Sequence, residues 1–70
     1  MADGNVYSVS EVVGVSTDSV EQAVRNALKR ANETLRNLDW FEVSEIRGTI
    51  NGAEVREFQV AVKIGFKLES

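Results

Sequence analysis

The chain has 70 residues, no cysteine and no histidine, and a formal net charge of −3. That length makes a single domain, residues 1–70, which buries only about 60% of its unfolded surface, so an isolated subunit is marginally stable. Without cysteine and histidine, disulfides and the usual nitrogen- and sulfur-ligated zinc sites are excluded, which leaves oligomerisation as the means of stabilisation. The net charge is acidic and no stretch of the chain is basic, which argues against a nucleic-acid partner.

The sequence also lacks the signals of several common functions. No apolar run reaches the length of a membrane span, and residues 1–5 are too polar and acidic for a signal peptide, so we expect a cytoplasmic protein with no membrane partner. Serine–histidine and cysteine–histidine catalytic systems lack their histidine, and neither a P-loop nor a glycine-rich dinucleotide motif is present. We therefore expect neither enzymatic activity nor a protein-ligated metal.

The first strand is predicted over residues 6–13, where Tyr7, Val9 and Val13 share one side of an alternating pattern. Gly14 is expected to end this strand. Ser16 then stands as the N-cap of a helix, because its hydroxyl can accept a hydrogen bond from a free amide of the first turn.

The helix is predicted from apolar residues that recur three and four positions apart and so form one buried stripe. The members of the stripe are Val20, Ala23, Val24, Ala27, Leu28, Ala31, Leu35 and Leu38. Charged and amide side chains fill the remaining positions. The pattern predicts a helix of about twenty residues, roughly 30 Å long, which only a long sheet could cover.

Two long strands follow the helix. Residues 40–50 predict the second strand and residues 53–68 the third, with Asn51-Gly52 between them as a type I′ hairpin turn. In the second strand the apolar pattern slips near Ser44-Glu45, which indicates a bulge.

These elements predict an α+β fold of the order β-α-β-β, with one long helix packed on a three-stranded antiparallel sheet. In the third strand the even-numbered residues are apolar and should face the helix, while the odd-numbered residues face away. The face without a helix is neither apolar enough for a second core nor polar enough for ordinary solvent surface. Its expected members are Trp40, Gln59, Ala61, Lys63, Gly65 and Lys67.

Three side chains suggest a binding site on that face. An exposed indole at Trp40 needs either a partner subunit or a planar ligand against it, and these two alternatives stay open. Gln59 can both donate to and accept from the edge of a heterocycle, and Arg47 offers a fork for a phosphate or carboxylate. A hairpin without bulges pairs Trp40 with Lys63 and Ser44 with Gln59. Trp40 and Gln59 are then about 13 Å apart along the sheet, so a site that uses both should span two subunits.

Several motifs at matching spacing make the chain resemble the dodecins, small flavin-binding proteins that assemble as hollow shells of twelve subunits. The similarity covers nearly the whole chain, from Val6 to Glu69, and includes the Glu11-Val12-Val13-Gly14 strand end. Its most specific motifs are Leu38-Asp39-Trp40-Phe41-Glu42-Val43, Ile46-Arg47-Gly48, Phe58-Gln59-Val60 and Gly65-Phe66-Lys67-Leu68-Glu69.

The resemblance implies a homododecamer that stores flavin mononucleotide without turnover, buffering free flavin and quenching its photoreactivity. In this family a tryptophan stacks on the isoalloxazine ring and a glutamine hydrogen-bonds its pyrimidine edge, with paired flavins held between tryptophans of two subunits. These roles fall on Trp40 and Gln59. Arg47 matches an arginine near the ligand, and Lys67 stands where several relatives have an arginine that reaches phosphate, so it keeps the charge but not the fork.

The sequence leaves several points open. Riboflavin is an alternative to flavin mononucleotide, and neither coenzyme A as a second ligand, nor ions bound in the shell, nor the recipient of the flavin is determined. The alternative function is a structural or interaction shell, in which Trp40 anchors an interface and no flavin is bound.

Overall fold

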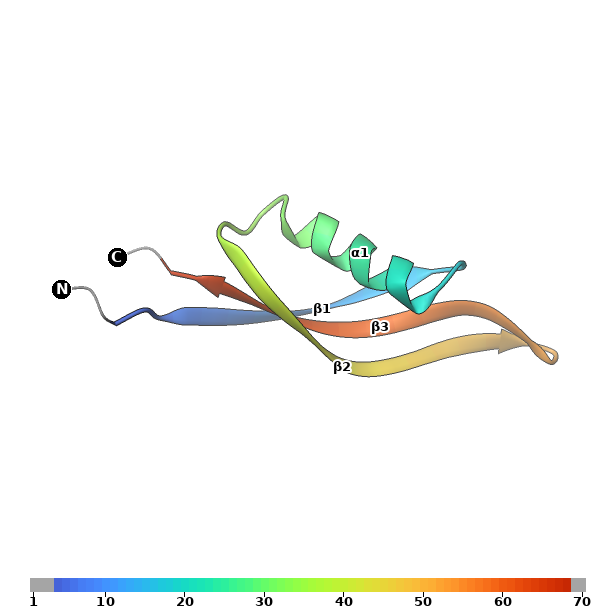
Figure 1. Ribbon diagram of the computed structural model, residues 1–70. Helices are drawn as coiled ribbons and strands as arrows, with labels where there is room; N and C mark the ends of the chain where they lie inside the picture. The colour runs from blue at the N-terminus through green and yellow to red at the C-terminus, as the bar shows by residue number, and fades with distance from the viewer. Residues whose placement is uncertain (1–3, 69–70) are drawn as a thin grey trace.

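The computed structural model describes residues 4–68 and contains four elements in the predicted order. The elements are β1 (Tyr7–Ser16), α1 (Val20–Ala31), β2 (Leu38–Asn51) and β3 (Glu54–Lys67). The strands form one antiparallel sheet in the order β1-β3-β2, and α1 lies across one of its faces (Figure 1). The predicted α+β fold of the order β-α-β-β is confirmed.

The core lies between α1 and the strands beneath it. Its buried members are Ala23, Val24, Ala27 and Ala31 of α1 and Val60, Val62 and Ile64 of β3. Three alanines bring the helix backbone close to the sheet, and a Cβ at Gly14 of β1 would collide with the carbonyl oxygen of Ala23. Contrary to the prediction, β1 does not end at Gly14. The strand continues to Ser16, and the glycine provides the room that the helix needs.

The helix begins later than predicted. Ser19, rather than Ser16, is the N-cap, and its hydroxyl accepts a hydrogen bond from the amide of Gln22 at 3.0 Å. The Ser16 hydroxyl accepts instead from the amide of Asp18 at 2.9 Å, in the turn that leads from β1 into α1. Two candidate caps stand close together, and the second one starts the helix.

The helix also ends earlier than predicted. It has 12 residues, about 18 Å in length. Leu35 and Leu38 continue its apolar spacing but lie in the connection and at the start of β2, where both still pack against the core. Asn37 in this connection has a left-handed φ of 63°, which asparagine tolerates better than most residues and which a helix cannot contain.

The hairpin turns one residue later than predicted. Asn51 pairs with Glu54, so Gly52 and Ala53 form the loop. Gly52 has a φ of 67°, whereas the φ of Ala53 is not positive. A positive φ at the first loop residue alone is typical of a type II′ turn rather than type I′.

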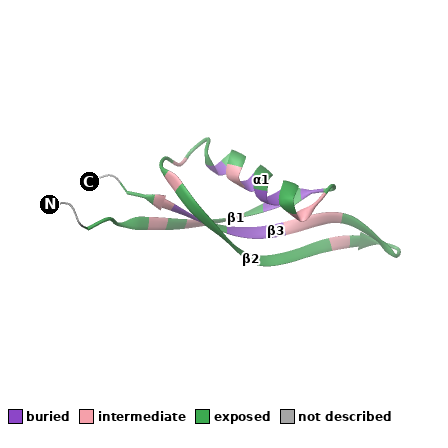
Figure 2. Ribbon diagram, viewed as in Figure 1, coloured by how far each residue is buried: buried purple, intermediate pink, exposed green. Residues whose placement is uncertain are grey.

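β2 departs from a simple hairpin register at three places. Its pairing with β3 shifts between Leu38 and Trp40, between Val43 and Glu45, and between Thr49 and Ile50. The second shift confirms the predicted bulge near Ser44-Glu45, and the other two were not predicted. α1 packs on β1 and β3, so most of β2 stays exposed (Figure 2).

The register predicted for a hairpin without bulges is therefore wrong. Trp40 pairs with Gly65 rather than with Lys63. Gln59 pairs with Arg47 rather than with Ser44. These new partners decide which side chains meet on the face opposite the helix.

Candidate ligand-binding face

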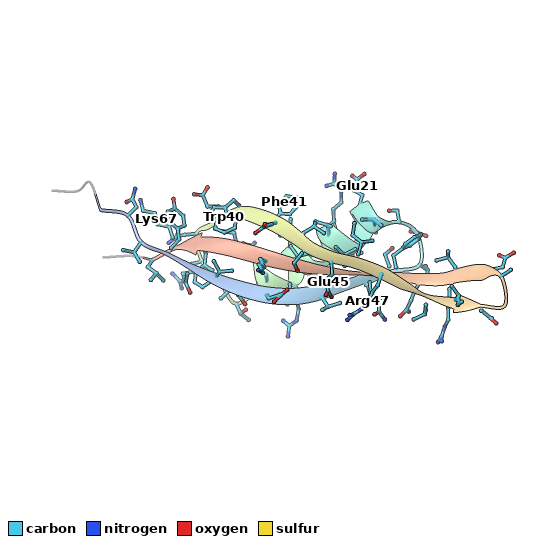
Figure 3. The ribbon with its side chains drawn as sticks, turned by 90° about the horizontal axis from the view of Figure 1, so that it is seen from below. Glu21, Trp40, Phe41, Glu45, Arg47 and Lys67 are labelled. Carbon is cyan, nitrogen blue, oxygen red and sulfur yellow. The ribbon has the colours of Figure 1, made fainter. Side chains whose placement is uncertain are left out.

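The face of the sheet opposite α1 is not covered by any element within residues 4–68, and we call it the open face. Side chains alternate along each strand, so the register determines its members. They include Tyr7, Val9, Glu11, Val13 and Val15 of β1, Trp40, Glu42, Glu45, Arg47 and Thr49 of β2, and Glu57, Gln59, Ala61, Lys63, Gly65 and Lys67 of β3. Figure 3 views the sheet from this side, with Trp40 and Lys67 toward one end and Glu45 and Arg47 nearer the middle of the long sheet. The four side chains predicted to bind the ligand all lie on this face.

Trp40 lies over Gly65 of the neighbouring strand. A Cβ added to Gly65 would collide at once with three adjacent indole atoms, Cε2, Cζ2 and Nε1, so the ring presents its face to the glycine. Gly65 is buried, whereas 43% of Trp40 stays exposed. The indole is thus supported by backbone on one side and exposed on the other, and only glycine at position 65 permits this.

Gln59 marks the other end of the three-stranded part of the open face, between Val15 on β1 and Arg47 on β2, and β2 and β3 continue beyond it to the hairpin. Its side-chain oxygen accepts a hydrogen bond from Nε of Arg47 at 3.2 Å, and its side-chain nitrogen donates to Oε2 of Glu57 at 3.0 Å. Nη1 of Arg47 lies 3.4 Å from Oε1 of Glu45. This exposed ion pair contributes little to stability, but it restricts where the guanidinium can lie.

The two ends are farther apart than predicted. Trp40 pairs with Gly65, which lies six residues beyond Gln59 on β3. At about 3.3 Å per residue this is about 20 Å, compared with the predicted value of about 13 Å. One planar ring cannot contact both side chains of the same subunit.

Two further residues at the Trp40 end were not predicted from the sequence. The phenol of Tyr7 donates a hydrogen bond to Oδ2 of Asp39 at 2.8 Å, so this contact joins the two edge strands across β3. The hydrogen bond to Asp39, followed by desolvation and the carboxylate charge, raises the pKa of Tyr7. Lys67 pairs with Tyr7 in the sheet. The available sequence signals were the parity that Tyr7 shares with Val9 and the position of Asp39 directly before Trp40.

The middle of the open face is charged. Glu11 of β1 and Glu42 of β2 both pair with Lys63, and Oγ of Ser44 donates to Oε2 of Glu11 at 2.8 Å. The part of the chain that the structure describes contains no group of three or more acidic side chains placed to hold a metal ion. The middle therefore separates the two ends without forming a metal site of that kind.

A second exposed surface lies on the helix side of β2, which α1 does not cover. Its apolar side chains include Phe41, Val43 and Ile46, with Phe41 50% and Ile46 60% exposed. An open apolar hollow nearby is lined by Leu28, Leu38, Asp39, Trp40, Phe41 and Ile64. Trp40 therefore borders both faces of the sheet. Contiguous apolar surface of this kind marks an interaction site.

Comparison with known proteins identifies the relatives of this fold. A family model described as Dodecin matches residues 6–69. The chain belongs to the dodecin family. A dodecin of Thermus thermophilus is 56% identical over 66 residues, which cover 94% of this chain and 96% of that protein. The family resemblance predicted from the sequence motifs is confirmed.

Solved structures of dodecins have the same architecture. A crystal structure of a Thermus thermophilus protein has a TM-score of 0.92 and 55% identity, covering 96% of this chain and 98% of that one. A dodecin from Streptomyces coelicolor has a TM-score of 0.92 and 54% identity, covering 99% of each chain. Membership of this family of small binding proteins indicates a homo-oligomer. Within residues 4–68, no helix is long and apolar enough to cross a membrane.

Proposed function

We propose that this dodecin is a flavin store. Flavin mononucleotide stacks between the Trp40 side chains of neighbouring subunits in a shell of twelve, which buffers free flavin in the cytoplasm and quenches its photoreactivity. The observation that supports this most strongly is the indole of Trp40, backed by Gly65 and exposed on its other side. Stacking of a base on an aromatic side chain contributes about 1–3 kcal/mol per ring. The proposal includes binding and release but no turnover.

The length of the open face supports a site shared between subunits. Because Trp40 and Gln59 are about 20 Å apart along one chain, a ring stacked on Trp40 meets a Gln59 only if a second subunit supplies it. In this arrangement each subunit contributes its apolar end to one site and its polar end to another. Assembly and binding then depend on the same surfaces.

Polar and charged groups give the bound ligand its orientation in this proposal. Gln59 hydrogen-bonds the pyrimidine edge of the ring, and Arg47 and Lys67 are the candidate phosphate contacts. Arg47 lies beside Gln59, while Lys67 lies two residues beyond Gly65 at the Trp40 end. Arginine can donate two parallel hydrogen bonds where lysine offers a point charge, so Arg47 is the stronger candidate. Riboflavin has the same ring and would use the same platform without these ionic contacts.

The exposed apolar surface supports the shell. Val9, Val13 and Val15 lie exposed on the open face, and Phe41 and Ile46 lie exposed on the helix side of β2. A chain of this size has a small core, and burial of both surfaces between subunits would add to it. The number of subunits, twelve, follows from the resemblance to the family.

The alternative function is a structural shell without flavin, in which Trp40 is an interface anchor. It is favoured by one observation, namely that Trp40 also lines the apolar hollow on the helix side, next to Phe41. A partner subunit seated in that hollow would contact Trp40. The two functions differ in whether the exposed indole face binds a ligand.

A fluorescence titration tests the proposal. Purified protein is added to riboflavin and to flavin mononucleotide, and flavin emission is followed to saturation. We expect strong quenching, because an electron-rich indole in contact with the excited ring offers a fast decay route. Emission that stays constant while light scattering shows an intact oligomer would leave the structural shell as the better explanation.

A further inference from the structure

The side-chain amide of Gln59 is held between two groups of opposite hydrogen-bonding character. Nε of Arg47 donates to its oxygen at 3.2 Å, and Oε2 of Glu57 accepts from its nitrogen at 3.0 Å. A guanidinium offers only donors and a carboxylate only acceptors. The amide therefore cannot turn over without losing both hydrogen bonds. Its neighbours thus fix the oxygen toward Arg47 and the nitrogen toward Glu57.

The surroundings reinforce this orientation. Glu45 contacts the guanidinium of Arg47 through a different nitrogen, with Nη1 3.4 Å from its carboxylate. On β1 the neighbour of Gln59 is Val15, whose side chain cannot hydrogen-bond. Glu57 and Gln59 are two residues apart on β3 and so lie on the same face of the sheet. The amide thus has one donor and one acceptor engaged, and none of the other paired side chains competes for the rest.

We propose that Arg47 and Glu57 are positioning residues, which orient the amide of Gln59 for a planar ligand edge that has an N–H beside a carbonyl. This inference rests on the proposed function. With both neighbours engaged, the amide keeps one lone pair on oxygen and one N–H on nitrogen. Side by side, these match the N–H and carbonyl of a lactam or imide. An amide turned the other way would place donor against donor and leave desolvated groups unpaired.

A positioning role and a phosphate contact affect different ligands. A phosphate contact strengthens binding of flavin mononucleotide but not of riboflavin, whereas orientation of the amide acts on the ring that both share. Glu57 separates the two roles, because a carboxylate repels phosphate. Removing Glu57 should not weaken a phosphate contact, so a loss of affinity that disappears when Gln59 is absent would indicate orientation of the amide.

A double-mutant cycle tests the inference. Riboflavin affinity is measured for wild type, Glu57→Ala and Glu57→Gln, and again for each of these combined with Gln59→Ala. Loss of one orienting hydrogen bond in Glu57→Ala should weaken binding about three- to tenfold. Glu57→Gln keeps an acceptor oxygen and should stay within about twofold of wild type. In the Gln59→Ala background, neither substitution at position 57 should have a further effect.

Matched variants keep the test independent of charge and folding. Glu54→Ala, on the same strand, makes the same change in charge without contacting the amide and should leave affinity unchanged. Arg47→Leu should weaken riboflavin by a similar factor and lose this effect in the Gln59→Ala background. The inference is overturned if Glu57→Gln is as harmful as Glu57→Ala, or if either effect persists without Gln59.

The outcome also distinguishes this inference from the proposed function. A wild type that binds neither flavin overturns both. If wild type binds both flavins and Gln59→Ala weakens them, but Glu57→Ala and Arg47→Leu leave riboflavin affinity unchanged, only the positioning roles are overturned. Light scattering of each variant confirms that affinities are compared between intact oligomers.

Discussion

The two ends of the open face are built from different kinds of interaction. At one end Trp40 lies on Gly65, and the contact is made by ring surface against backbone. At the other end Gln59 is held by directional hydrogen bonds from Arg47 and to Glu57. The first end gives a ligand a surface for stacking, and the second gives it directional hydrogen bonds. Because about 20 Å separates them in one subunit, substitutions at the two ends should affect binding in different ways.

The largest effect is expected from Gly65→Val at the Trp40 end. A valine side chain occupies the space that the indole fills, so the ring must leave its platform and the stack is lost together with its support. We expect at least about a hundredfold loss of affinity for both flavins, the upper end of the range for one stacking ring. Lys63→Val, on the same strand and face, is the control and should bind far better than Gly65→Val. Equal affinities in the two variants would contradict the role of the glycine.

Trp40→Ala should weaken both flavins about ten- to a hundredfold, because it removes the stacking surface but leaves the backbone in place. Flavin emission should recover where any binding remains. Affinity is followed by calorimetry and assembly by light scattering. If the oligomer dissociates and wild type shows no flavin affinity, Trp40 is an interface anchor and the structural shell is the better function.

Gln59→Ala tests the opposite end, where we expect a loss of about tenfold. Removing the amide leaves a ring carbonyl or imide unpaired at a desolvated site, which costs about 1–3 kcal/mol. Both flavins share that edge and should lose affinity by the same factor. A loss confined to flavin mononucleotide would show that Gln59 contacts the phosphate side of the ligand instead.

The sequence predicts the Trp40 end better than the spacing between the ends. Alternation in β3 places Gly65 and Gln59 on one face without ambiguity, since Val60, Val62 and Ile64 between them are fully buried and a one-residue slip would expose them. No such constraint acts on β2, where most side chains are exposed on both faces. Its unpredicted register shifts therefore left no apolar signature, and only the bulge near Ser44-Glu45 could be inferred.

The predicted length of the helix was wrong for a related reason. Leu35 and Leu38 pack against the core, as members of the helical stripe would, and so their spacing suggested a longer helix. Burial determines that such residues are apolar, but it does not determine the backbone that presents them. The decisive signal was local, in the asparagine that adopts a left-handed φ in the connection.

A smaller effect is expected from the two cationic side chains. If Arg47 or Lys67 contacts the phosphate, replacing it with alanine should weaken flavin mononucleotide by a few-fold more than riboflavin, as expected for an exposed ion pair. The difference should shrink as salt rises, because exposed charges are screened. Calorimetry of both ligands at low and high salt measures it. A wild type that binds both flavins equally at low salt would remove the phosphate roles and leave the stacking platform intact.

The smallest change is expected at the hydrogen bond between Tyr7 and Asp39, which borders the Trp40 end. Tyr7 is the only tyrosine of the chain, so the absorbance of phenolate reports on it alone. Donation to the Asp39 carboxylate raises the pKa of Tyr7, and the folded protein should keep this phenol protonated at a pH where an unfolded tyrosine, with a pKa of about 10, begins to ionise. The contribution of this hydrogen bond to stability is full below about pH 10 and is lost as pH rises through the higher pKa of the folded state.

Asp39→Asn checks this directly, since an amide can accept from the phenol but has no negative charge to oppose its ionisation. The titration midpoint should move down toward about 10. Asp18→Asn, in the turn before α1, removes the same charge far from Tyr7 along the chain and should leave the midpoint unchanged. The Trp40 end differs from the Gln59 end here too, because the hydrogen bond between Tyr7 and Asp39 joins the edge strands without engaging the indole, which stays free to stack. If Asp39→Asn and wild type ionise at the same pH, the phenol does not donate to Asp39 in solution.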